Sequence, residues 1–527
     1  MDSTEILIPS LLVAVAALSA AAGWVQIPYP ILLVLGGLAL GFIPGIPTVE
    51  LDPDLILFGV LPPLLYSAAF FADLRALRDY SRAISLTAIG LVLLTTLTVA
   101  VVAHAMIDEL SWAGAFALGA IVSPTDPIAA TTIMRRLGAP RRVVNAVEGE
   151  SLVNDASALV AYRVAIAAAV GGSFSLMEAA GEFVLAGVGG VAIGLVVGWV
   201  SAEVRRRLED PPVEITVSLF TGYAAFLPAD ELGLSGVLAA VTAGIYVGWK
   251  APTIASPEVR LQGFAFWEIL SFLLNAGLFV LIGLQLQPIL DDLSSESTLD
   301  AAGYAAVISA IVIATRFLWM FTTPYVLRAL DRRPSQVERR ASARERIVIG
   351  WSGMRGAVSL AAALAIPLET DAGAAFPGRD LILLITFGVI VVTVVGQGLT
   401  LPALIRGLGI RDTGDEEQEE ARARIEAAQA ALDRLEELTD ADWVRPDTLE
   451  RVGRVYDYRR RRFAARTGEV EDDGFEDRSI AYQRLMHELY DAQRDTLLRL
   501  RNEGRISNDV MHRIERELDL EESRLEI

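Results

Sequence analysis

The sequence has no cysteine and only three histidines, His104, His487 and His512. The absence of cysteine excludes disulfides, thiolate metal sites and cysteine nucleophiles, and so few histidines argue against a zinc enzyme. Lysine occurs once, as Lys250, so arginine supplies the remaining positive charge. The formal net charge of −20 argues against nucleic acid as a partner. We expect no resident cofactor.

Charged residues are also too scarce for a soluble protein of this size. Only 21% of the 527 residues are charged and 53% are hydrophobic. Apolar runs long enough to span a bilayer recur through residues 1–410 and stop there, which predicts an all-α polytopic membrane protein. We expect about thirteen transmembrane helices, at roughly 5–23, 28–46, 51–71, 83–106, 112–136, 142–170, 177–203, 213–229, 233–249, 261–290, 300–329, 344–369 and 380–408.

The loops between these segments alternate in charge along the chain. One set carries positive residues: Arg75, Arg78, Arg82, Arg135, Arg136, Arg141, Arg142, Arg205, Arg206, Arg207, Lys250, Arg260 and the arginines of 328–346. The other set carries acids: Glu50, Asp52, Asp54, Asp108, Glu109, Glu178, Asp230, Glu231, Asp291, Asp292, Glu369 and Asp371. The positive-inside rule then predicts a multi-pass protein of the cell membrane with its N-terminus outside and the arginine loops and tail in the cytoplasm.

An odd number of segments also permits two six-helix halves of opposite orientation around one linking helix, the inverted-repeat plan of many secondary transporters. The two halves should then break at matching places. In the fifth segment, SPTDP places Pro124 and Pro127 three residues apart, which removes two helix donors and predicts a discontinuous helix. Thr125 or Asp126 is suited to cap the half-helix that resumes after the break.

The equivalent segment of the second half is the twelfth, and it contains GWSGMRG at 350–356. Glycine recurs there at every third place, including Gly353 and Gly356, and Arg355 lies between them. Prolines that merely kink and glycines that merely pack would explain either motif alone. Their matched positions favour two discontinuous helices that line a cavity. Arg355 is expected to neutralise carbonyl ends at this break, with pH sensing as the alternative.

The sixth segment carries a polar stripe in VEGESLVNDASALV. Glu150 and Asn154 are four residues apart, as are Ser151 and Asp155, so the four share one face of a helix. A charge at the centre of a lipid-facing helix costs about 2.5 to 3.5 kcal/mol, so this face should turn toward the broken helices. Burial favours a protonated carboxyl group and a bound cation favours a carboxylate, so a proton and a small cation would compete for Asp155.

These segments resemble one known family. SPTDP, GESLVNDA, Arg316 in ATRFLWMF and GMRGAVSLAAAL together are similar to the NhaP-type branch of the monovalent cation/proton antiporters, which includes the sodium/proton exchangers. The resemblance covers roughly residues 1–410 and implies a NhaA-like antiporter fold with crossed discontinuous helices. It further implies a homodimer whose protomers have a dimerisation subdomain and a core subdomain that moves like an elevator.

The resemblance also assigns roles to residues. It implies that Asp155 carries the ion and the proton and that Thr125 and Asp126 complete the Na⁺ site, in an ion- and proton-binding set that also holds Asn154 and Ser151. An Asn-Asp pair resembles the electroneutral class, which exchanges one cation for one proton.

Other residues are assigned structural roles or depart from the pattern. The resemblance favours a salt bridge between Glu150 and Arg316, and an arginine in mid-membrane needs an anionic partner. Ser67 stands where related sequences commonly carry an acid, which puts a ligand from the third segment in doubt. Ala156 replaces the usual glycine after Asn-Asp.

Residues 411–527 change character and are rich in charge, which predicts a cytosolic helical domain. The leading functional hypothesis is an antiporter exchanging Na⁺, Li⁺ or K⁺ for H⁺, with a K⁺/H⁺ antiporter as the first alternative. A cation channel and an intramembrane aspartyl protease built on Asp126 and Asp155 are weaker alternatives. The protease would need the two acids to share a proton, and Asp126 is fixed between Thr125 and Pro127.

Overall fold

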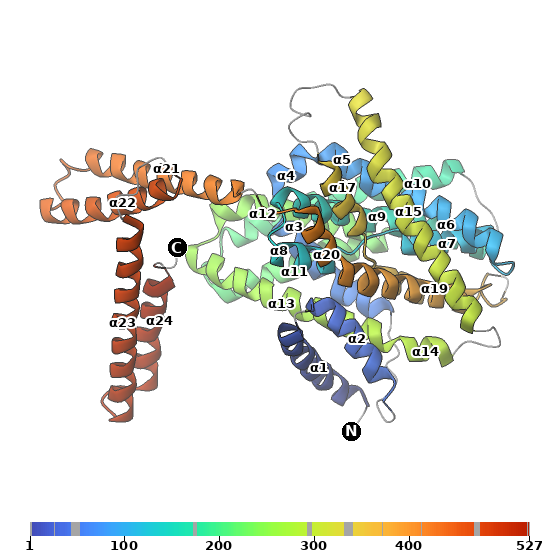
Figure 1. Cartoon of the computed structure of the whole chain (residues 1–527), viewed down its shortest axis with the longest axis horizontal. Helices are drawn as coiled ribbons and strands as arrows, with labels where there is room; N and C mark the ends of the chain where they lie inside the picture. The colour runs from blue at the N-terminus through green and yellow to red at the C-terminus, as the bar shows by residue number, and fades with distance from the viewer. Residues whose placement is uncertain are drawn as a thin grey trace. The chain divides into compact units, whose positions relative to one another are not determined.

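The computed structural model describes residues 3–25, 27–43, 53–171, 176–291, 298–330, 341–371, 373–412, 414–467, 475–523 and 525. The chain divides into two compact units, Met1–Arg411 and Asp412–Ile527. In the described residues every regular element is a helix, and the one β-bridge joins Glu369 and Ala375 (Figure 1). The expectation of an all-helical protein is therefore confirmed for this part of the chain.

The helices of the first unit follow the apolar segments of the sequence. They are α1 (Ser3–Val25), α2 (Tyr29–Gly41), η1 (Leu55–Val60), α3 (Leu61–Phe70), α4 (Leu74–Asp79), α5 (Ser81–Ser85), η2 (Leu86–Leu91), α6 (Val92–Met106), α7 (Trp112–Val122), α8 (Ile128–Arg136), α9 (Arg141–Gly171), α10 (Leu176–Arg205), α11 (Pro211–Glu231), α12 (Gly236–Ile254), α13 (Pro257–Leu284), α14 (Leu286–Asp291), α15 (Thr298–Leu330), α17 (Ala343–Trp351), α18 (Ala357–Leu364), α19 (Arg379–Val391), η3 (Val392–Gln397) and α20 (Gly398–Leu408). The η elements are π-helical turns.

Seven helical stretches of the described residues are long and apolar enough to cross a membrane: Ser81–Met106, Arg141–Gly171, Ala180–Arg205, Gly236–Ile254, Pro257–Ile289, Asp300–Val326 and Arg379–Leu408. Shorter apolar helices occupy Pro9–Val25, Tyr29–Gly41, Leu55–Phe70 and Trp112–Val122. Each of the thirteen segments expected from the sequence contains helix, but the number of crossings stays a prediction. Glu50, Asp52, Asp292 and residues 331–340 of the expected loops lie outside the described residues.

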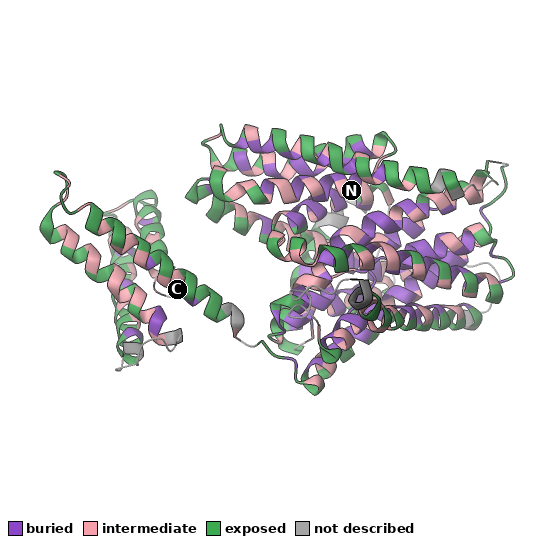
Figure 2. Ribbon diagram, turned by 90° about the horizontal axis from the view of Figure 1, so that it is seen from above, coloured by how far each residue is buried: buried purple, intermediate pink, exposed green. Residues whose placement is uncertain are grey.

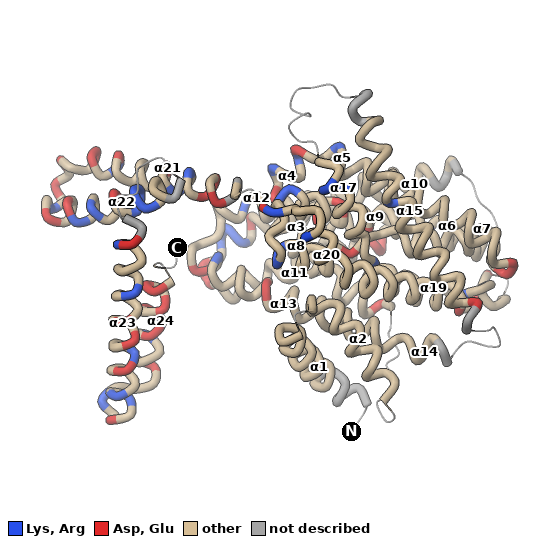
Figure 3. The backbone as a smooth tube through the Cα atoms, in the orientation of Figure 1, with Lys and Arg blue, Asp and Glu red and all other residues tan. Residues whose placement is uncertain are grey.

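Buried and charged residues divide along these helices. Figure 2 shows buried residues gathered on the faces that the helices of the first unit turn toward one another. Figure 3 shows long stretches of α1, α2, α6 and α19 without Lys, Arg, Asp or Glu, whereas α21 to α24 of the second unit carry both signs densely. Because lipid cannot hydrate a charge, this pattern is that of a membrane-embedded helical unit.

Small residues bring neighbouring helices into close contact. Gly190, Gly194 and Gly198 form a stripe on α10. A Cβ at Gly194 would meet the backbone of Ala239 in α12, and one at Gly190 would meet the backbone of Ser235, the N-cap of α12. Gly37 of α2 and Gly283 of α13 approach each other in the same way. Lipid-embedded helices gain little from hydrophobic burial against one another, so such close backbone packing supplies much of their association energy.

Ion pairs join several arginine-bearing helix ends. Arg142, at the start of α9, pairs with Glu345 at the start of α17 (2.6 Å), and Arg141 lies 3.8 Å from Asp73. Glu345 also completes a capping box with Ser342. These contacts hold the ends of α9, α17 and the segment before α4 on one side of the unit.

The described residues of the second unit form four charged helices, α21 (Asp415–Glu437), α22 (Pro446–Thr467), α23 (Phe475–Asn502) and α24 (Asn508–Ser523). Tyr490 and Leu497 of α23 form a small apolar core with Met511 and Leu518 of α24. Residues 468–474, between α22 and α23, lie outside the described residues.

The packing of α23 on α24 should weaken in acid. The pKa of Glu522 lies below its usual range, first because Arg494 donates a hydrogen bond to its carboxylate and then because His487 pairs with it at 2.7 Å. A lowered pKa means that the carboxylate stabilises the folded state above the ordinary glutamate pKa and that this stability is lost as pH falls through the lowered value. Amide hydrogen exchange of α24 in the full chain, corrected for intrinsic rates, should therefore speed up below about pH 4.

Glu522→Gln should remove most of this pH dependence and speed exchange already at neutral pH. Glu517→Gln is the matched control, because Glu517 is an exposed acid on the same helix. Equal behaviour of the two variants would show that the Arg494–Glu522 pair does not stabilise the hairpin.

Candidate functional site

The two discontinuous helices meet at their breaks. The backbone is non-helical between the end of α7 at Val122 and the start of α8 at Ile128, and again between α17 and α18. The backbone N–H of Asp126, in the first break, donates a hydrogen bond of 2.7 Å to the carbonyl of Met354 in the second. A donor and an acceptor that helix formation leaves free therefore satisfy each other across the crossing.

Arg355 serves both breaks from a fully buried position. Its Nε donates to the carbonyl of Val122 at the end of α7 (3.0 Å), and its Nη1 donates to the carbonyl of Gly353. Its own backbone N–H donates to Oγ1 of Thr393 (3.0 Å). The guanidinium thus supplies positive charge where a helix C-terminus carries partial negative charge. The sequence reading anticipated neither Thr393 nor the reach to Val122, although a threonine within the apolar run TFGVIVVTVV was a visible signal.

Asp126 holds the start of α8 and packs directly on the second break. Its Oδ1 accepts a hydrogen bond from the backbone N–H of Ile128 (2.9 Å), which satisfies one free donor of the half-helix. A Cβ at Gly356 would collide with the Asp126 carboxylate. Only a residue without a side chain therefore fits between α18 and this carboxylate. Pro124 and Pro127 flank the same stretch and line the adjoining cavity.

Glu150 and Arg316 form a bidentate salt bridge inside the first unit. Arg316 Nη1 lies 2.5 Å from Glu150 Oε1, and Nη2 lies 3.0 Å from Oε2. Arg316 is 1% exposed and Glu150 is 4% exposed. The guanidinium also donates to the carbonyl of Ile349, near the end of α17, at 3.2 Å, and Gly353 leaves room for its side chain. The pair links α9 and α15 to the second broken helix.

A side-chain network joins the first break to α9. Thr125 Oγ1 donates to Glu150 Oε1 (3.2 Å) and accepts from Asn154 Nδ2 (2.8 Å). The hydroxyl proton of Thr125 and one amide proton of Asn154 are thus used within the protein. Oδ1 of Asn154 is buried and has no hydrogen-bond partner among the described residues.

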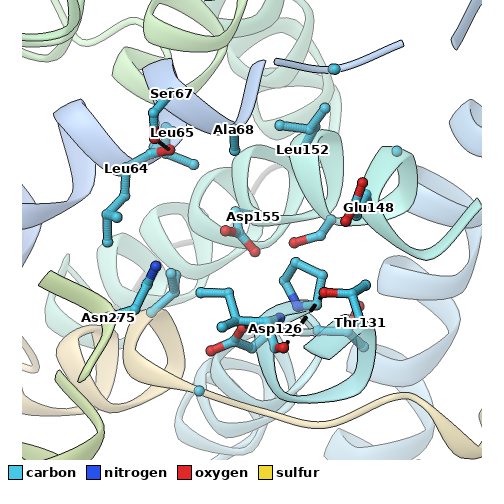
Figure 4. Close-up of a pocket in the computed structure, with 18 of the residues that line it drawn as sticks. Leu64, Leu65, Ser67, Ala68, Asp126, Thr131, Glu148, Leu152, Asp155 and Asn275 are labelled. Atoms are coloured by element: carbon cyan, nitrogen blue, oxygen red, sulfur yellow. Dashed lines mark hydrogen bonds between the residues drawn. The ribbon is translucent and has the colours of Figure 1, made fainter. Parts of the chain in front are cut away.

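Asp155 differs from these acids because its carboxylate has no partner among the described residues. Its side chain is 7% exposed. No hydrogen bond or ion pair links it to any of the described residues. It lines a cavity of about 340 Å³ together with Asp126, Thr125 and Ser151. Figure 4 shows the carboxylates of Asp155 and Asp126 directed into the same space. A buried carboxylate that is only partly hydrated is stable only with a proton or a cation bound to it.

The opposite wall of the cavity offers neutral oxygens instead. Ser67 of α3 and Ser271 of α13 lie 3.2 Å apart through their hydroxyls, and Asn275 of α13 faces the same space (Figure 4). Ser67, where the acid of related sequences is missing, thus has a serine partner. The sequence reading did not single out Ser271 or Asn275, because both lie in a segment that otherwise looks apolar.

The cavity connects the two carboxylates with an arginine-bearing end of the unit. Its lining also includes Asp73, Arg135 and Glu148, and the last two form an ion pair of 2.7 Å. Figure 4 shows Glu148 among the residues that line this cavity. The described residues contain no cluster of three or more His, Cys, Asp or Glu side chains suited to hold a metal ion. Two carboxylates with hydroxyl and amide oxygens are hard oxygen ligands, which suit a hard cation.

The sequence is similar to those of several known proteins. Residues 10–407 match the family model described as "Sodium/hydrogen exchanger, transmembrane". The chain is 36% identical over 499 residues to an uncharacterized Na⁺/H⁺ exchanger of Mycobacterium tuberculosis, covering 94% of this chain and 91% of that one. It is 35% identical to the sodium, potassium, lithium and rubidium/H⁺ antiporter of Bacillus subtilis, covering 72% of this chain and 58% of that one.

A solved structure shares the fold. The sodium proton antiporter MjNhaP1 of Methanocaldococcus jannaschii superposes with a TM-score of 0.59 at 19% sequence identity, covering 77% of this chain and 99% of that one.

Gly356→Ala should disturb the crossing, because the added methyl group has no space beside Asp126. Overpacking of this kind costs about 1–3 kcal/mol, so the melting temperature of the purified protein should fall. Gly396→Ala is the matched control, since a Cβ there would meet nothing within 4 Å. Equal melting temperatures for the two variants would show that the crossing is not packed as described.

Replacing only one residue of the Glu150–Arg316 pair should destabilise the protein more than replacing both. Removing one partner leaves an uncompensated buried charge, which costs about 3–5 kcal/mol. Glu150→Gln and Arg316→Met should therefore each lower the melting temperature more than the double variant does. A double variant that is as unstable as the sum of the two single losses would contradict a structural pair.

Proposed function

Because the chain belongs to the sodium/hydrogen exchanger family, we propose that it exchanges Na⁺, or another monovalent cation such as Li⁺ or K⁺, for H⁺ across the cell membrane. Its family and its relatives are transporters, so it is a transporter and not an enzyme. The alternative of an intramembrane protease is thereby set aside.

The observation that carries the proposal is the unpartnered carboxylate of Asp155 in the cavity. An ion or a proton bound there neutralises the charge, and the two cannot bind to it together. Asp126 Oδ2 and the Ser151 hydroxyl are placed to contribute further oxygens from the same cavity. Binding of the cation would expel the proton on one side of the membrane, and protonation would expel the cation on the other.

The surrounding charges favour a 1:1 exchange that moves no net charge. The guanidinium of Arg316 is balanced by Glu150. No ion pair joins Asp126 to an arginine among the described residues, and its Oδ1 accepts a hydrogen bond from the backbone N–H of Ile128 instead. In this proposal Asp155 alone takes up and releases the transported ions. A monovalent cation and a proton bring the same charge to it, so replacing one by the other moves no net charge.

The proposed transport movement is of the elevator type. The two breaks are hydrogen-bonded to each other and to α9, so they would move together as one core subdomain. The opposite wall, from α3 and α13, would belong to the dimerisation subdomain of a homodimer. Thirteen transmembrane helices in two inverted six-helix halves, with residues 411–527 as a separate cytosolic domain, complete the proposed architecture.

The proposed orientation places the arginine-bearing ends in the cytoplasm and the N-terminus outside. Arg142 and Arg141 are held close to α17 and to the segment before α4, so at least three of these ends share one side of the unit. The cavity reaches Arg135 at the same side. The structure would then correspond to a state in which Asp155 is reached from the cytoplasm.

A broader cation range is the second candidate. The Bacillus subtilis relative is named for sodium, potassium, lithium and rubidium. Neutral oxygens from Ser67, Ser271 and Asn275 on the opposite wall would tolerate ions of different radius better than a further carboxylate would. A K⁺/H⁺ exchanger with the same site is therefore a specific alternative.

Asp155→Asn should abolish exchange. In everted membrane vesicles acidified by respiration, addition of Na⁺, Li⁺ or K⁺ should raise the internal pH through the native protein. The rate should be insensitive to the membrane potential, because the exchange is electroneutral. The asparagine side chain has the same shape but carries no negative charge, so it cannot hold the cation or take up the proton. The exchange rate of the variant should therefore fall to that of vesicles without the protein.

Glu268→Gln is the control for an acid-to-amide change on a membrane helix, because Glu268 is exposed on α13 and lies outside the cavity lining. It should exchange at the native rate. Undiminished exchange by Asp155→Asn would refute the proposed carrier. Native exchange that generates a current would refute the 1:1 stoichiometry.

A further inference from the structure

Ser359, in the first turn of α18, has a buried hydroxyl group without a partner. The residue is 1% exposed, and its Oγ has no hydrogen-bond partner among the described residues. It lines the cavity that contains Asp155 and Asp126. A buried hydroxyl normally has a partner, since leaving it unpaired is unfavourable. This group therefore needs an explanation beyond packing.

Several other buried hydroxyl groups of the first unit find a hydrogen-bond acceptor within their own helix. They donate to the carbonyl four residues earlier, as Ser157 does to Val153 (3.3 Å), Ser309 to Ala305 (2.7 Å), Ser352 to Val348 (2.5 Å) and Thr393 to Val389 (2.8 Å). This bond is the ordinary one for serine and threonine in membrane helices.

Ser359 has no such bond because of the break. The residue four positions earlier is Arg355, which precedes the helix, and the backbone of Gly356 between them is extended (φ −144°, ψ −148°). The discontinuity that forms the crossing thus also frees the hydroxyl of Ser359. Ser359 lines the same cavity as Gly356, which packs against Asp126.

We propose that Ser359 is a cation-binding residue whose hydroxyl oxygen, offered by the second broken helix, helps to hold the dehydrated monovalent cation at Asp155 and Asp126. This deepens the proposed function and rests on it. A hydroxyl oxygen adds a ligand without adding charge, so it leaves the proposed 1:1 stoichiometry unchanged. A proton on Asp155 does not need this ligand, so Ser359 would favour the cation in its competition with the proton.

The first test is the apparent affinity for Na⁺ in everted vesicles at fixed pH. Loss of one neutral ligand is worth about tenfold in affinity. Ser359→Ala should therefore raise the KM for Na⁺ about tenfold, with little change in the maximal rate. Ser359→Thr keeps the hydroxyl and should restore the native KM. Ser309→Ala is the control, because its hydroxyl is used within α15.

The second test measures binding without turnover. A ligand that binds only the folded state stabilises it by RT ln(1 + [L]/Kd), so the rise in melting temperature depends on the ligand concentration relative to Kd. Purified native protein should be stabilised by Na⁺, Ser359→Ala should need about tenfold more Na⁺ for the same shift, and Ser359→Thr should match the native protein. Asp155→Asn should show no shift.

The outcomes separate the two proposals. Native protein that neither exchanges nor binds Na⁺ would overturn the proposed function itself. Native exchange with an unchanged KM in Ser359→Ala would overturn only the role of Ser359. A Ser359→Ala variant that loses maximal rate and stability while keeping its KM would show that the hydroxyl is structural, and this also overturns the inference.

Discussion

An acid that has no partner inside a membrane protein limits the states that the protein can occupy. In a dry interior, a carboxylate without a partner has a much higher free energy than a carboxylate that has bound a proton or a cation. Asp155 is in this position, while Glu150 and Asp126 are held by other groups. Contacts with Arg316 and with the backbone N–H of Ile128 give Glu150 and Asp126 a partner, which leaves Asp155 as the buried acid of this site without one among the described residues.

The crossing of the broken helices makes this separation of roles achievable. Helix ends that stop within the membrane expose donors and acceptors that would ordinarily face lipid. Here Asp126 and Met354 satisfy each other, and Arg355 reaches the carbonyls of both breaks. The same breaks give backbone geometry from which oxygens can point into the cavity. Ser359 is one example, because its usual intrahelical acceptor has been displaced.

Much of this could be predicted from local sequence. The two prolines of SPTDP and the glycines of GWSGMRG predict the breaks. Proline removes a helical hydrogen bond, and glycine has a low helix propensity. The spacing of Glu150, Ser151, Asn154 and Asp155 predicts one polar face, and all four side chains are buried. The expected pairing of Glu150 with Arg316 came from resemblance, since nothing local connects two residues so distant in the chain.

Contacts between distant segments could not be predicted in this way. No local pattern shows that the backbone of Arg355 would meet Thr393, or that Ser271 would face Ser67. Such contacts depend on how α3, α13 and α19 pack, which hydropathy does not determine. The number of membrane crossings is uncertain from sequence for a related reason, because a helix interrupted by a break is two short apolar pieces.

The hydrogen bond between Asp126 and Met354 joins two backbone groups. The side chains at these positions could therefore change in evolution without loss of this bond. Any residue with an amide hydrogen can donate at the first position, and any residue at all can accept at the second. Of all single replacements, only proline at position 126 would delete the link directly. A lineage could therefore change its ion preference by altering neighbouring side chains and inherit the scaffold intact.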